Sequence, residues 1–217
     1  MSKADPNSFV QGEMRGVAMK LHTRDQAPRE GQQEETGKKF AEWAPTRAGY
    51  LQFLVDSRAV YSTFDEVVGA NDALAALRDT GLERTAALEK DIAWMLETYP
   101  ELATPPVSDN AAAYCAFLKD IAAKSVPGFV CHFYNHYFAH TAGGIMIGKK
   151  VADLCLGGQK LAFYQWASDV RALLDAVRVN IDAMADGWSR EEKDECLDET
   201  ARTFKYGGSL LGSITGA

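Results

Sequence analysis

The chain has 217 residues, of which 47% are apolar and 24% charged, a composition typical of one globular domain that buries a sizeable core. It carries 30 acidic and 23 basic residues, a net charge of −7. We therefore expect no nucleic-acid partner, because phosphate binding requires a basic surface. No segment approaches the ~18 apolar residues of a membrane span, so we expect no membrane anchor. Collagen, a disordered tail and a disulfide-dense miniprotein are excluded.

Helical spacing dominates the sequence, and no convincing alternating strand is present. The sequence predicts an all-α, single-domain bundle of seven to nine helices. We expect the domain to cover residues 9–211, between a flexible N-terminus, 1–8, and a C-terminal tail, 212–217. The predicted helices cover about 9–23, 46–68, 71–79, 80–99, 111–124, 127–155, 162–185 and 189–211, and a loop covers 25–37.

Local signals set several of the predicted helix ends. Thr80–Glu83 and Ser189–Glu192 both have the form of a capping box, in which the first side chain and the glutamate each bond a free backbone amide. Pro127 suits a first helical turn. The four cysteines are scattered without a C-x-x-C pair, so zinc ribbons and dithiol motifs are excluded and we expect reduced, mostly buried thiols.

Glycines interrupt one predicted helix at Gly143, Gly144 and Gly148. Each glycine inside a helix costs roughly 1 kcal/mol relative to alanine, and this is tolerated where something approaches the backbone closely. Spacing alone favours a second helix packed on a groove of small residues. The other interpretation is a kinked helix that lies against a flat ligand.

Three of the four histidines share one face of that helix. His132, His136 and His140 have i, i+4, i+8 spacing. Three imidazoles can bind zinc or copper, but no carboxylate or cysteine lies at helical spacing beside them, so spacing favours a buried polar network. His22 stands apart near the end of the first helix. Gln26, four residues later, is placed to bond one ring nitrogen and leave the other for a metal.

Taken together, these residues resemble heme oxygenase of the plastid type of plants and algae. The resemblance covers about residues 9–211 and is strongest from Cys131 to Gly144. Its other segments are Glu13–Thr23, Gly49–Arg58, Thr80–Arg84, Trp188–Lys193 and Phe204–Tyr206. No single motif decides it, but this many segments in order are highly specific.

The resemblance implies that the cofactor and substrate is heme b, with His22 as the proximal ligand of the iron. A neutral imidazole supplies the lone pair that iron requires. Gln26 matches the partner of that histidine, which is a glutamate in animal enzymes. Gly143 and Gly144 match the distal-helix glycines, whose backbone lies over the heme face and steers oxidation to one meso carbon.

The resemblance also implies contacts to the heme propionates. Tyr134 and Arg178 match propionate-binding residues, and Arg15 matches a basic position of the first helix. Arginine suits a carboxylate because its donors form a two-pronged fork. Met19 and Leu174 stand where the family has lysines, and we expect the adjacent Lys20 to substitute. Phe204 is expected to contact the cofactor.

The distal side departs from the animal and cyanobacterial pattern. His140 stands where those enzymes have an aspartate that organises proton-delivering waters, and plant-type enzymes share this change. Tyr61 matches a tyrosine of the same network. We therefore expect His140, Tyr61 and the two glycines to act in catalysis, while the role of His136 stays open.

The implied reaction converts heme and dioxygen to biliverdin IXα, carbon monoxide and ferrous iron, with electrons from ferredoxin. A bilin reductase would take the product toward phycobilins or phytochrome chromophore. The implied location is the plastid stroma, with a transit peptide absent from this sequence, or the cytoplasm of a prokaryote. The alternative is a non-catalytic tetrapyrrole-binding protein of the same fold, but such relatives lose the histidine that His22 represents. Another enzyme on this fold would need a nucleophilic cysteine, for which Cys131 is the candidate, or a carboxylate and histidine cluster.

Overall fold

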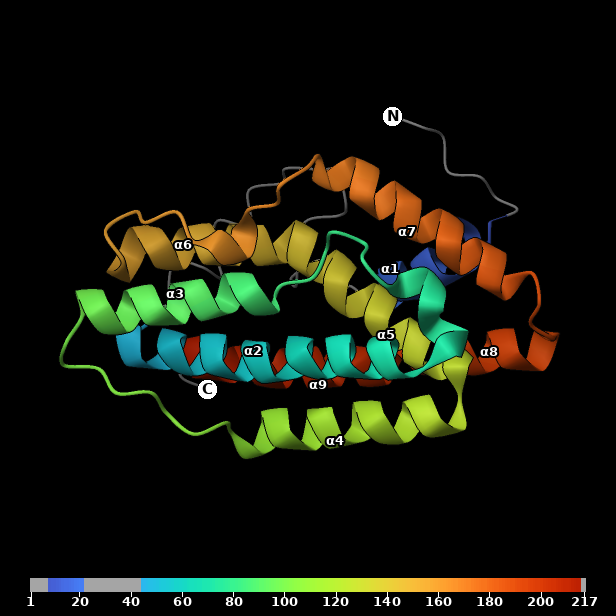
Figure 1. The fold of residues 1–217 in the computed structure, drawn as a ribbon, viewed down its shortest axis with the longest axis horizontal. Helices are drawn as coiled ribbons and strands as arrows, with labels where there is room; N and C mark the ends of the chain where they lie inside the picture. Colours follow the sequence, from blue (N-terminus) through green and yellow to red (C-terminus); the bar gives the residue numbers. More distant parts are fainter. Residues whose placement is uncertain (1–7, 22–43, 216–217) are drawn as a thin grey trace.

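The computed structural model describes residues 8–21 and 44–215, and within these ranges every regular element is helical. The predicted all-α class is confirmed. Figure 1 shows the long helices stacked in layers, with α2 and α9 lying between α4 and the layer formed by α3, α5 and α6. The α-helices are α1 (Arg15–Leu21), α2 (Arg47–Ala70), α3 (Thr85–Thr98), α4 (Asp109–Lys124), α5 (Val126–Ala139), α6 (Ile145–Cys155), α7 (Val170–Ala185), α8 (Arg190–Asp198) and α9 (Thr200–Thr215).

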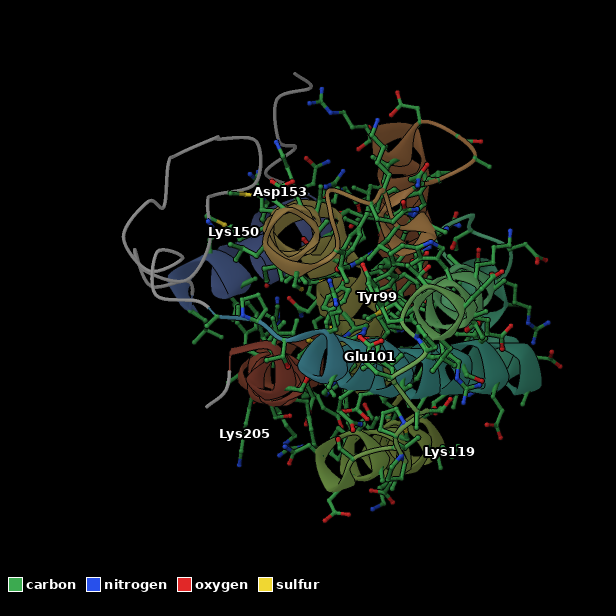
Figure 2. The ribbon with its side chains drawn as sticks, turned by 90° about the vertical axis from the view of Figure 1, so that its left-hand side faces the viewer. Tyr99, Glu101, Lys119, Lys150, Asp153 and Lys205 are labelled. Carbon is green, nitrogen blue, oxygen red and sulfur yellow. The ribbon has the colours of Figure 1, made fainter. Side chains whose placement is uncertain are left out.

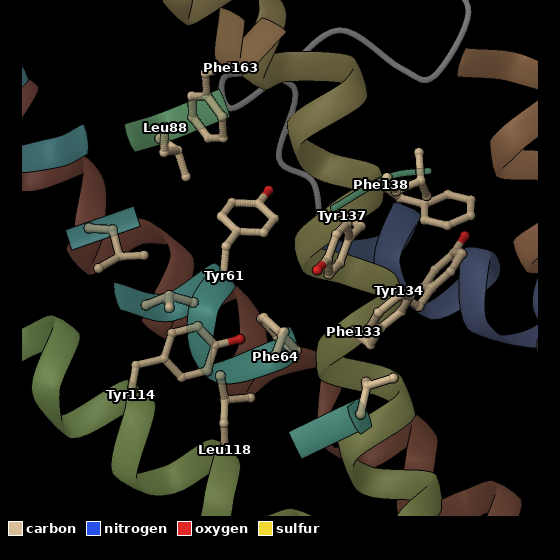
Figure 3. Close-up of a cluster of buried hydrophobic side chains, with 14 of the residues drawn as sticks. Tyr61, Phe64, Leu88, Tyr114, Leu118, Phe133, Tyr134, Tyr137, Phe138 and Phe163 are labelled. Atoms are coloured by element: carbon tan, nitrogen blue, oxygen red, sulfur yellow. The ribbon is translucent and has the colours of Figure 1, made fainter. Parts of the chain in front are cut away.

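Helix α2 is the central element of the bundle. It begins where predicted, because the Thr46 hydroxyl caps it by accepting a hydrogen bond from the Gly49 amide at 3.0 Å. Buried side chains on several of its faces pack against α3, α4 and α9. Tyr61 and Phe64 lie in the aromatic cluster of Figure 3, opposite Tyr137 and Phe133 of α5. This burial on several faces places α2 in the core of the bundle.

Helices α5 and α6 form one continuous element joined by a π-helical turn, η4 (His140–Gly144). Pro127 lies in its first turn, as predicted, and Ser125 caps it. Figure 1 shows the helix axis changing direction where α5 passes into α6. The π-turn coincides with the glycine pair, and such turns are frequent at functional sites because they widen the helix locally.

The first described residues are bonded to α7 and α8, which lie late in the sequence. A π-helix, η1 (Phe9–Met14), precedes α1, and its cap residue Ser8 donates to the Asp182 carboxylate of α7 at 2.6 Å. The other Asp182 oxygen accepts from the Val10 amide at 2.9 Å. Arg190 of α8 also pairs with Glu13 at 2.8 Å. These bonds set the position from which α1 runs past α9.

The predicted capping box at Thr80–Glu83 does not open a helix. Glu83 does accept from the Thr80 amide at 2.7 Å, but Thr80 accepts from Leu82, one position too early for a capping box. Gly81 adopts a φ of +78°, which ends any helical path there. Helix α3 therefore begins at Thr85.

The predicted helix over residues 162–185 is also wrong at its start. Residues Ala162–Tyr164 form a 3₁₀ turn, η5, and α7 begins only at Val170, where Asp169 caps it. This difference matters because η5 packs against the continuous helix formed by α5, η4 and α6, and does not extend α7.

The second capping box, Ser189–Glu192, is confirmed at the start of α8. The predicted single helix over 189–211 is interrupted at Glu199, and α9 then runs to Thr215, beyond the predicted end at 211. Ile214 is buried, so part of the expected C-terminal tail belongs to the packed helix. Figure 1 shows α9 lying directly behind α2.

All four cysteines are free, and Cys131 and Cys196 are buried whereas Cys115 and Cys155 are partly exposed. Among the described helices, none is long and apolar enough to cross a membrane.

Candidate active site

The distal helix is the continuous element formed by α5, η4 and α6. Its residues change from buried to partly exposed at the π-turn. Residues Phe129–Asn135 of α5 are all buried, whereas every residue from Thr141 to Ile147 is partly exposed. This stretch begins with Thr141, Ala142, Gly143 and Gly144, whose short side chains leave backbone accessible. The partly exposed stretch of small residues is therefore the place where a planar ligand can approach the helix backbone.

His140 is buried at the first position of the π-turn, with 8% of its surface exposed. Its Nε2 lies 2.9 Å from the Phe163 carbonyl oxygen, and its ring stacks on the Phe163 ring at 3.9 Å between centroids. Burial lowers the pKa of His140 to about 3, although the bond to Phe163 opposes this shift. The imidazole is therefore neutral at physiological pH.

Tyr61 of α2 reaches the same region from the other side. Its ring contacts Tyr137, His140 and Phe163 with centroid distances of 5.0, 6.0 and 5.7 Å. Figure 3 shows its hydroxyl pointing away from α2, toward the side of Phe163. That hydroxyl is buried and has no hydrogen-bond partner among the described residues. Because an unsatisfied buried hydroxyl is costly, a water or ligand network is expected to complete it.

The other two histidines of the face have different environments. His132 is fully buried in a polar network: Nδ1 lies 3.1 Å from the Tyr114 hydroxyl and Nε2 lies 3.1 Å from Glu199. The prediction of a structural network is thus confirmed for His132. The His136 ring packs on Tyr61 and Phe64 with centroids 4.8 and 5.3 Å apart. Burial lowers its pKa to about 3.

The glycines of the distal helix serve two separate purposes. A Cβ at Gly148 would lie 2.2 Å from the Tyr164 ring, so Gly148 makes room for η5 and the packing interpretation holds at this position. A Cβ at Gly144 would lie 2.9 Å from Nδ1 of His140 and would meet no atom of η5 among its nearest neighbours. The absence of a side chain at Gly144 therefore leaves Nδ1 of His140 uncrowded. Gly143 lies beside it, partly exposed in the same π-turn.

Two of the predicted propionate residues contact the same side chain, Phe138. The Tyr134 ring lies 4.3 Å from the Phe138 ring, and the Arg178 guanidinium of α7 lies 4.9 Å from the same ring. Arg178 also pairs with Asp175 at 2.5 Å. Part of its charge is therefore already balanced within α7.

The remaining predicted contacts are spread along two helices. Arg15 is partly exposed at the start of α1, and Lys20 is exposed near its end. Phe204 is partly exposed on α9, against which α1 packs. Leu174, at a position where the family has lysine, is buried in the core, and Met19 is partly exposed.

His22 and Gln26 lie outside the described residues, so the structure does not test the predicted iron ligand or its partner. In the described ranges no group of three or more His, Cys, Asp or Glu residues is arranged to hold a metal ion. The three-histidine face therefore offers no metal site of its own within the part of the chain that is described.

Sequence reasoning missed the residues that hold His140. Asp91 of α3 is buried and accepts hydrogen bonds from the Ala162 and Phe163 amides at 2.8 and 2.7 Å. Phe163 and Tyr164 then cover the outer side of the distal helix. Asp91 is more than 70 residues from these partners, and no local pattern signals such a contact.

Solved structures show which fold this is. The protein resembles the heme oxygenase-1 of the cyanobacterium Synechocystis sp. PCC6803, solved in complex with heme, with a TM-score of 0.76 at 18% identity, covering 97% of this chain and 93% of that one. The bundle therefore has the heme oxygenase fold.

Sequence comparison gives the family. The family model for heme oxygenase matches residues 18–211. The chain is 47% identical to the chloroplastic heme oxygenase 1 of Oryza sativa subsp. japonica over 211 residues, covering 95% of this chain and 71% of that protein. It is 43% identical to the chloroplastic heme oxygenase 1 of Arabidopsis thaliana over 215 residues, 97% of this chain and 75% of that protein. A probable inactive chloroplastic heme oxygenase 2 of Arabidopsis is 39% identical over 174 residues, 79% of this chain and 58% of that protein. This chain belongs to the heme oxygenase family.

Proposed function

We propose that this heme oxygenase cleaves heme to biliverdin IXα, carbon monoxide and ferrous iron, at a site formed by the first helix and the glycine-bearing π-turn. The observation that carries the proposal is the π-turn itself. Its small residues are partly exposed, and the neutral His140 and the unsatisfied Tyr61 hydroxyl lie beside it. These groups fit a flat, apolar substrate with a small polar centre.

Each matched residue has a proposed task. His22 binds the iron as a neutral imidazole, and Gln26 fixes the orientation of its ring. Tyr134, Arg178 and Arg15 bind the propionates, with Lys20 beside them, and Phe204 packs on the macrocycle. Bound heme supplies the iron at which dioxygen is reduced. Gly143 and Gly144 would leave room beside the bound heme for small molecules only.

The distal polar groups hold and orient water. His140 is neutral, so it contributes a lone pair rather than a charge. The Tyr61 ring lies beside the His140 and His136 rings, and its hydroxyl is buried without a partner among the described residues, so it would donate to a water that His140 also binds. Such a water provides protons at the place where reduced oxygen requires them, which is the usual contribution of a positioned polar network.

We further propose that plant-type ferredoxin is the electron donor and the plastid stroma the location. The support is the chloroplastic naming of the relatives and the position of basic residues. Lys149 is exposed and Lys150 partly exposed on α6. Figure 2 shows Lys150 on the flank of α6 nearest α1, whereas Lys119 lies on α4 at the opposite side of the molecule. Basic residues on this flank would attract an acidic partner. The product would pass to a bilin reductase.

Absorption spectra and product analysis test the proposal together. Hemin is titrated into the protein and into His22→Ala, and ascorbate is then added. The wild type should give a histidine-ligated heme spectrum and then a biliverdin spectrum. His22→Ala should lose both, with coordination restored by imidazole. Heme binding without biliverdin in the wild type would favour the non-catalytic tetrapyrrole-binding alternative.

A further inference from the structure

The bond between His140 and Phe163 determines where the proton of the imidazole lies. A carbonyl oxygen only accepts hydrogen bonds, so the Phe163 carbonyl, 2.9 Å from Nε2, requires Nε2 to carry the hydrogen. A neutral imidazole has one N–H, so Nδ1 is then an unprotonated acceptor. Among the described residues nothing donates to Nδ1, which faces Gly144.

The Phe163 carbonyl can select this tautomer only if its own position is fixed. Asp91 supplies the restraint, because both of its carboxylate oxygens accept a backbone amide of η5, from Ala162 at 2.8 Å and from Phe163 at 2.7 Å. The Asp91 side chain is 4% exposed, so water cannot easily replace these bonds. Burial raises the Asp91 pKa, and the two amide bonds oppose this rise.

Further contacts hold the rest of η5 in the same place. Arg84 donates to the Gln165 carbonyl at 2.6 Å and lies over the Trp166 ring at 4.8 Å. The Tyr164 hydroxyl bonds to that of Tyr50 at 2.8 Å. The carbonyl of Phe163 therefore belongs to a segment that is held by Asp91 of α3, by Arg84 just before α3 and by Tyr50 of α2.

We propose that Asp91 is a positioning residue for the heme oxygenase reaction: through the Phe163 carbonyl it holds His140 as the Nε2–H tautomer, with Nδ1 presented to the distal space beside Gly144 as a hydrogen-bond acceptor. A water that donates one hydrogen to Nδ1 keeps its other hydrogen for a neighbouring group. With the opposite tautomer the ring would present a donor, and the water would turn its lone pair toward the ring. Asp91 thus sets the orientation of distal water from outside the site.

This inference rests on the proposed function only for its consequence in turnover. The tautomer itself can be read in heme-free protein, since the nitrogen-15 shifts of a histidine distinguish protonated from unprotonated ring nitrogens. A protein with the predicted tautomer and no biliverdin formation would contradict the proposed function alone. A protein that forms biliverdin while His140 carries its proton on Nδ1 would contradict this inference alone.

The experiment records histidine nitrogen-15 spectra of the full chain, assigned with His140→Asn, for the wild type, Asp91→Asn and the control Glu97→Gln. Glu97 is exposed on the same helix. The wild type and Glu97→Gln should show unprotonated Nδ1. Asp91→Asn offers one acceptor oxygen in place of two, so a mixture of tautomers is expected. Its kcat with ascorbate should fall by roughly ten-fold to a hundred-fold, as for partners that orient other functional histidines, with the Kd for hemin changed less than about three-fold (~0.65 kcal/mol).

A second variant distinguishes the effect of the Phe163 carbonyl on His140 from the effect of the Phe163 ring. Phe163→Leu keeps the carbonyl but removes the stacking partner of His140, so the tautomer should be unchanged. Protonated Nδ1 in the wild type would overturn the proposal without recourse to any variant. The same conclusion would follow if folded Asp91→Asn kept both the wild-type tautomer and the wild-type kcat, because Asp91 would then only stabilise η5.

Discussion

Tyr61 stands edge-on to His140, with ring centroids 6.0 Å apart and an interplanar angle of 69°. One side chain comes from the central helix α2 and the other from the π-turn of the distal helix. Their polar atoms differ in one respect: His140 has a protein partner at Nε2, whereas the Tyr61 hydroxyl has none among the described residues. The pair therefore combines a fixed ring with a hydroxyl that is free to bind water.

Tyr61→Phe should change the free energy of unfolding of the heme-free protein by less than about 1 kcal/mol, because the hydroxyl that it removes bonds to no protein group among the described residues. Turnover should fall at the same time if the hydroxyl serves the water network. Denaturant unfolding and hemin turnover measure the two effects.

Tyr114→Phe is the matched control for Tyr61→Phe. The Tyr114 hydroxyl is bonded to Nδ1 of His132 at 3.1 Å, so its loss should destabilise the fold by about 1 kcal/mol and leave turnover nearly unchanged. Equal destabilisation of both variants would mean that Tyr61 has a partner in the folded, heme-free protein.

Replacing Gly144 with alanine should lower turnover strongly, because the added Cβ would lie 2.9 Å from Nδ1 of His140 and crowd the acceptor. Gly207→Ala is the control, since a Cβ there meets no atom within 4 Å in α9. Both changes add a good helix former, worth up to about 1 kcal/mol. Gly207→Ala should therefore gain stability and keep its rate. Wild-type turnover by Gly144→Ala would assign this glycine to helix flexibility alone.

His140 should make the fold sensitive to acid. Its pKa is about 3 in the folded protein and about 6.5 in an unfolded chain. Between these values the unfolded chain binds a proton that the folded chain does not, so stability falls as the pH drops through 6.5 toward 3. At pH 5 the loss amounts to roughly 2 kcal/mol.

His140→Leu should remove this part of the pH dependence. Unfolding free energies measured from pH 7 to pH 5 should then decline less steeply than in the wild type, by roughly 2 kcal/mol over that range, whatever the absolute stability of the variant. Parallel curves for the two proteins would show that His140 is already protonated, or exposed, in the fold.

Ferredoxin-driven turnover should fall steeply with ionic strength, while ascorbate-driven turnover should change little, because attraction between proteins is screened beyond ~8–10 Å at physiological salt. Charge reversal at Lys149 and Lys150 should raise the KM for ferredoxin and leave hemin binding unchanged. Lys119→Glu on α4 is the control, and its exposed ion pair with Glu66 contributes little to stability. A salt-independent KM would place the docking surface elsewhere.

Local patterns predicted those parts of the fold that depend on neighbouring residues. Ser189 caps α8 as the sequence indicates, and α2 begins close to its predicted start, where Thr46 caps it. At Thr80 the same kind of pattern fails, because the positive φ of Gly81 turns the chain before a helix can begin. The i, i+4, i+8 spacing of the histidines correctly gave one face, but their roles depend on partners such as Glu199 that lie far away in sequence.

The site could be predicted only in part for the same reason. Resemblance to the family marked Tyr134 and Arg178, and the structure does bring them to one side chain, Phe138. The roles of Asp91 and Phe163 could not be predicted from the sequence, because they depend on the contact between α3 and η5 in the folded chain. A kinked helix was one of two interpretations of the glycines, and spacing alone favoured the other one, close packing of a second helix; the structure has a π-turn at Gly143 and Gly144.

Chromatography of the bilin formed from the hemin complex with dioxygen and reduced ferredoxin tests the central claim most directly. We predict biliverdin IXα as the single isomer, together with one carbon monoxide per heme, because Gly143 and Gly144 would crowd the distal side of bound heme, as the resemblance to the family implies. A mixture of isomers would contradict that account of the distal helix. Heme that survives the incubation intact would contradict the assignment of a heme oxygenase activity to this chain.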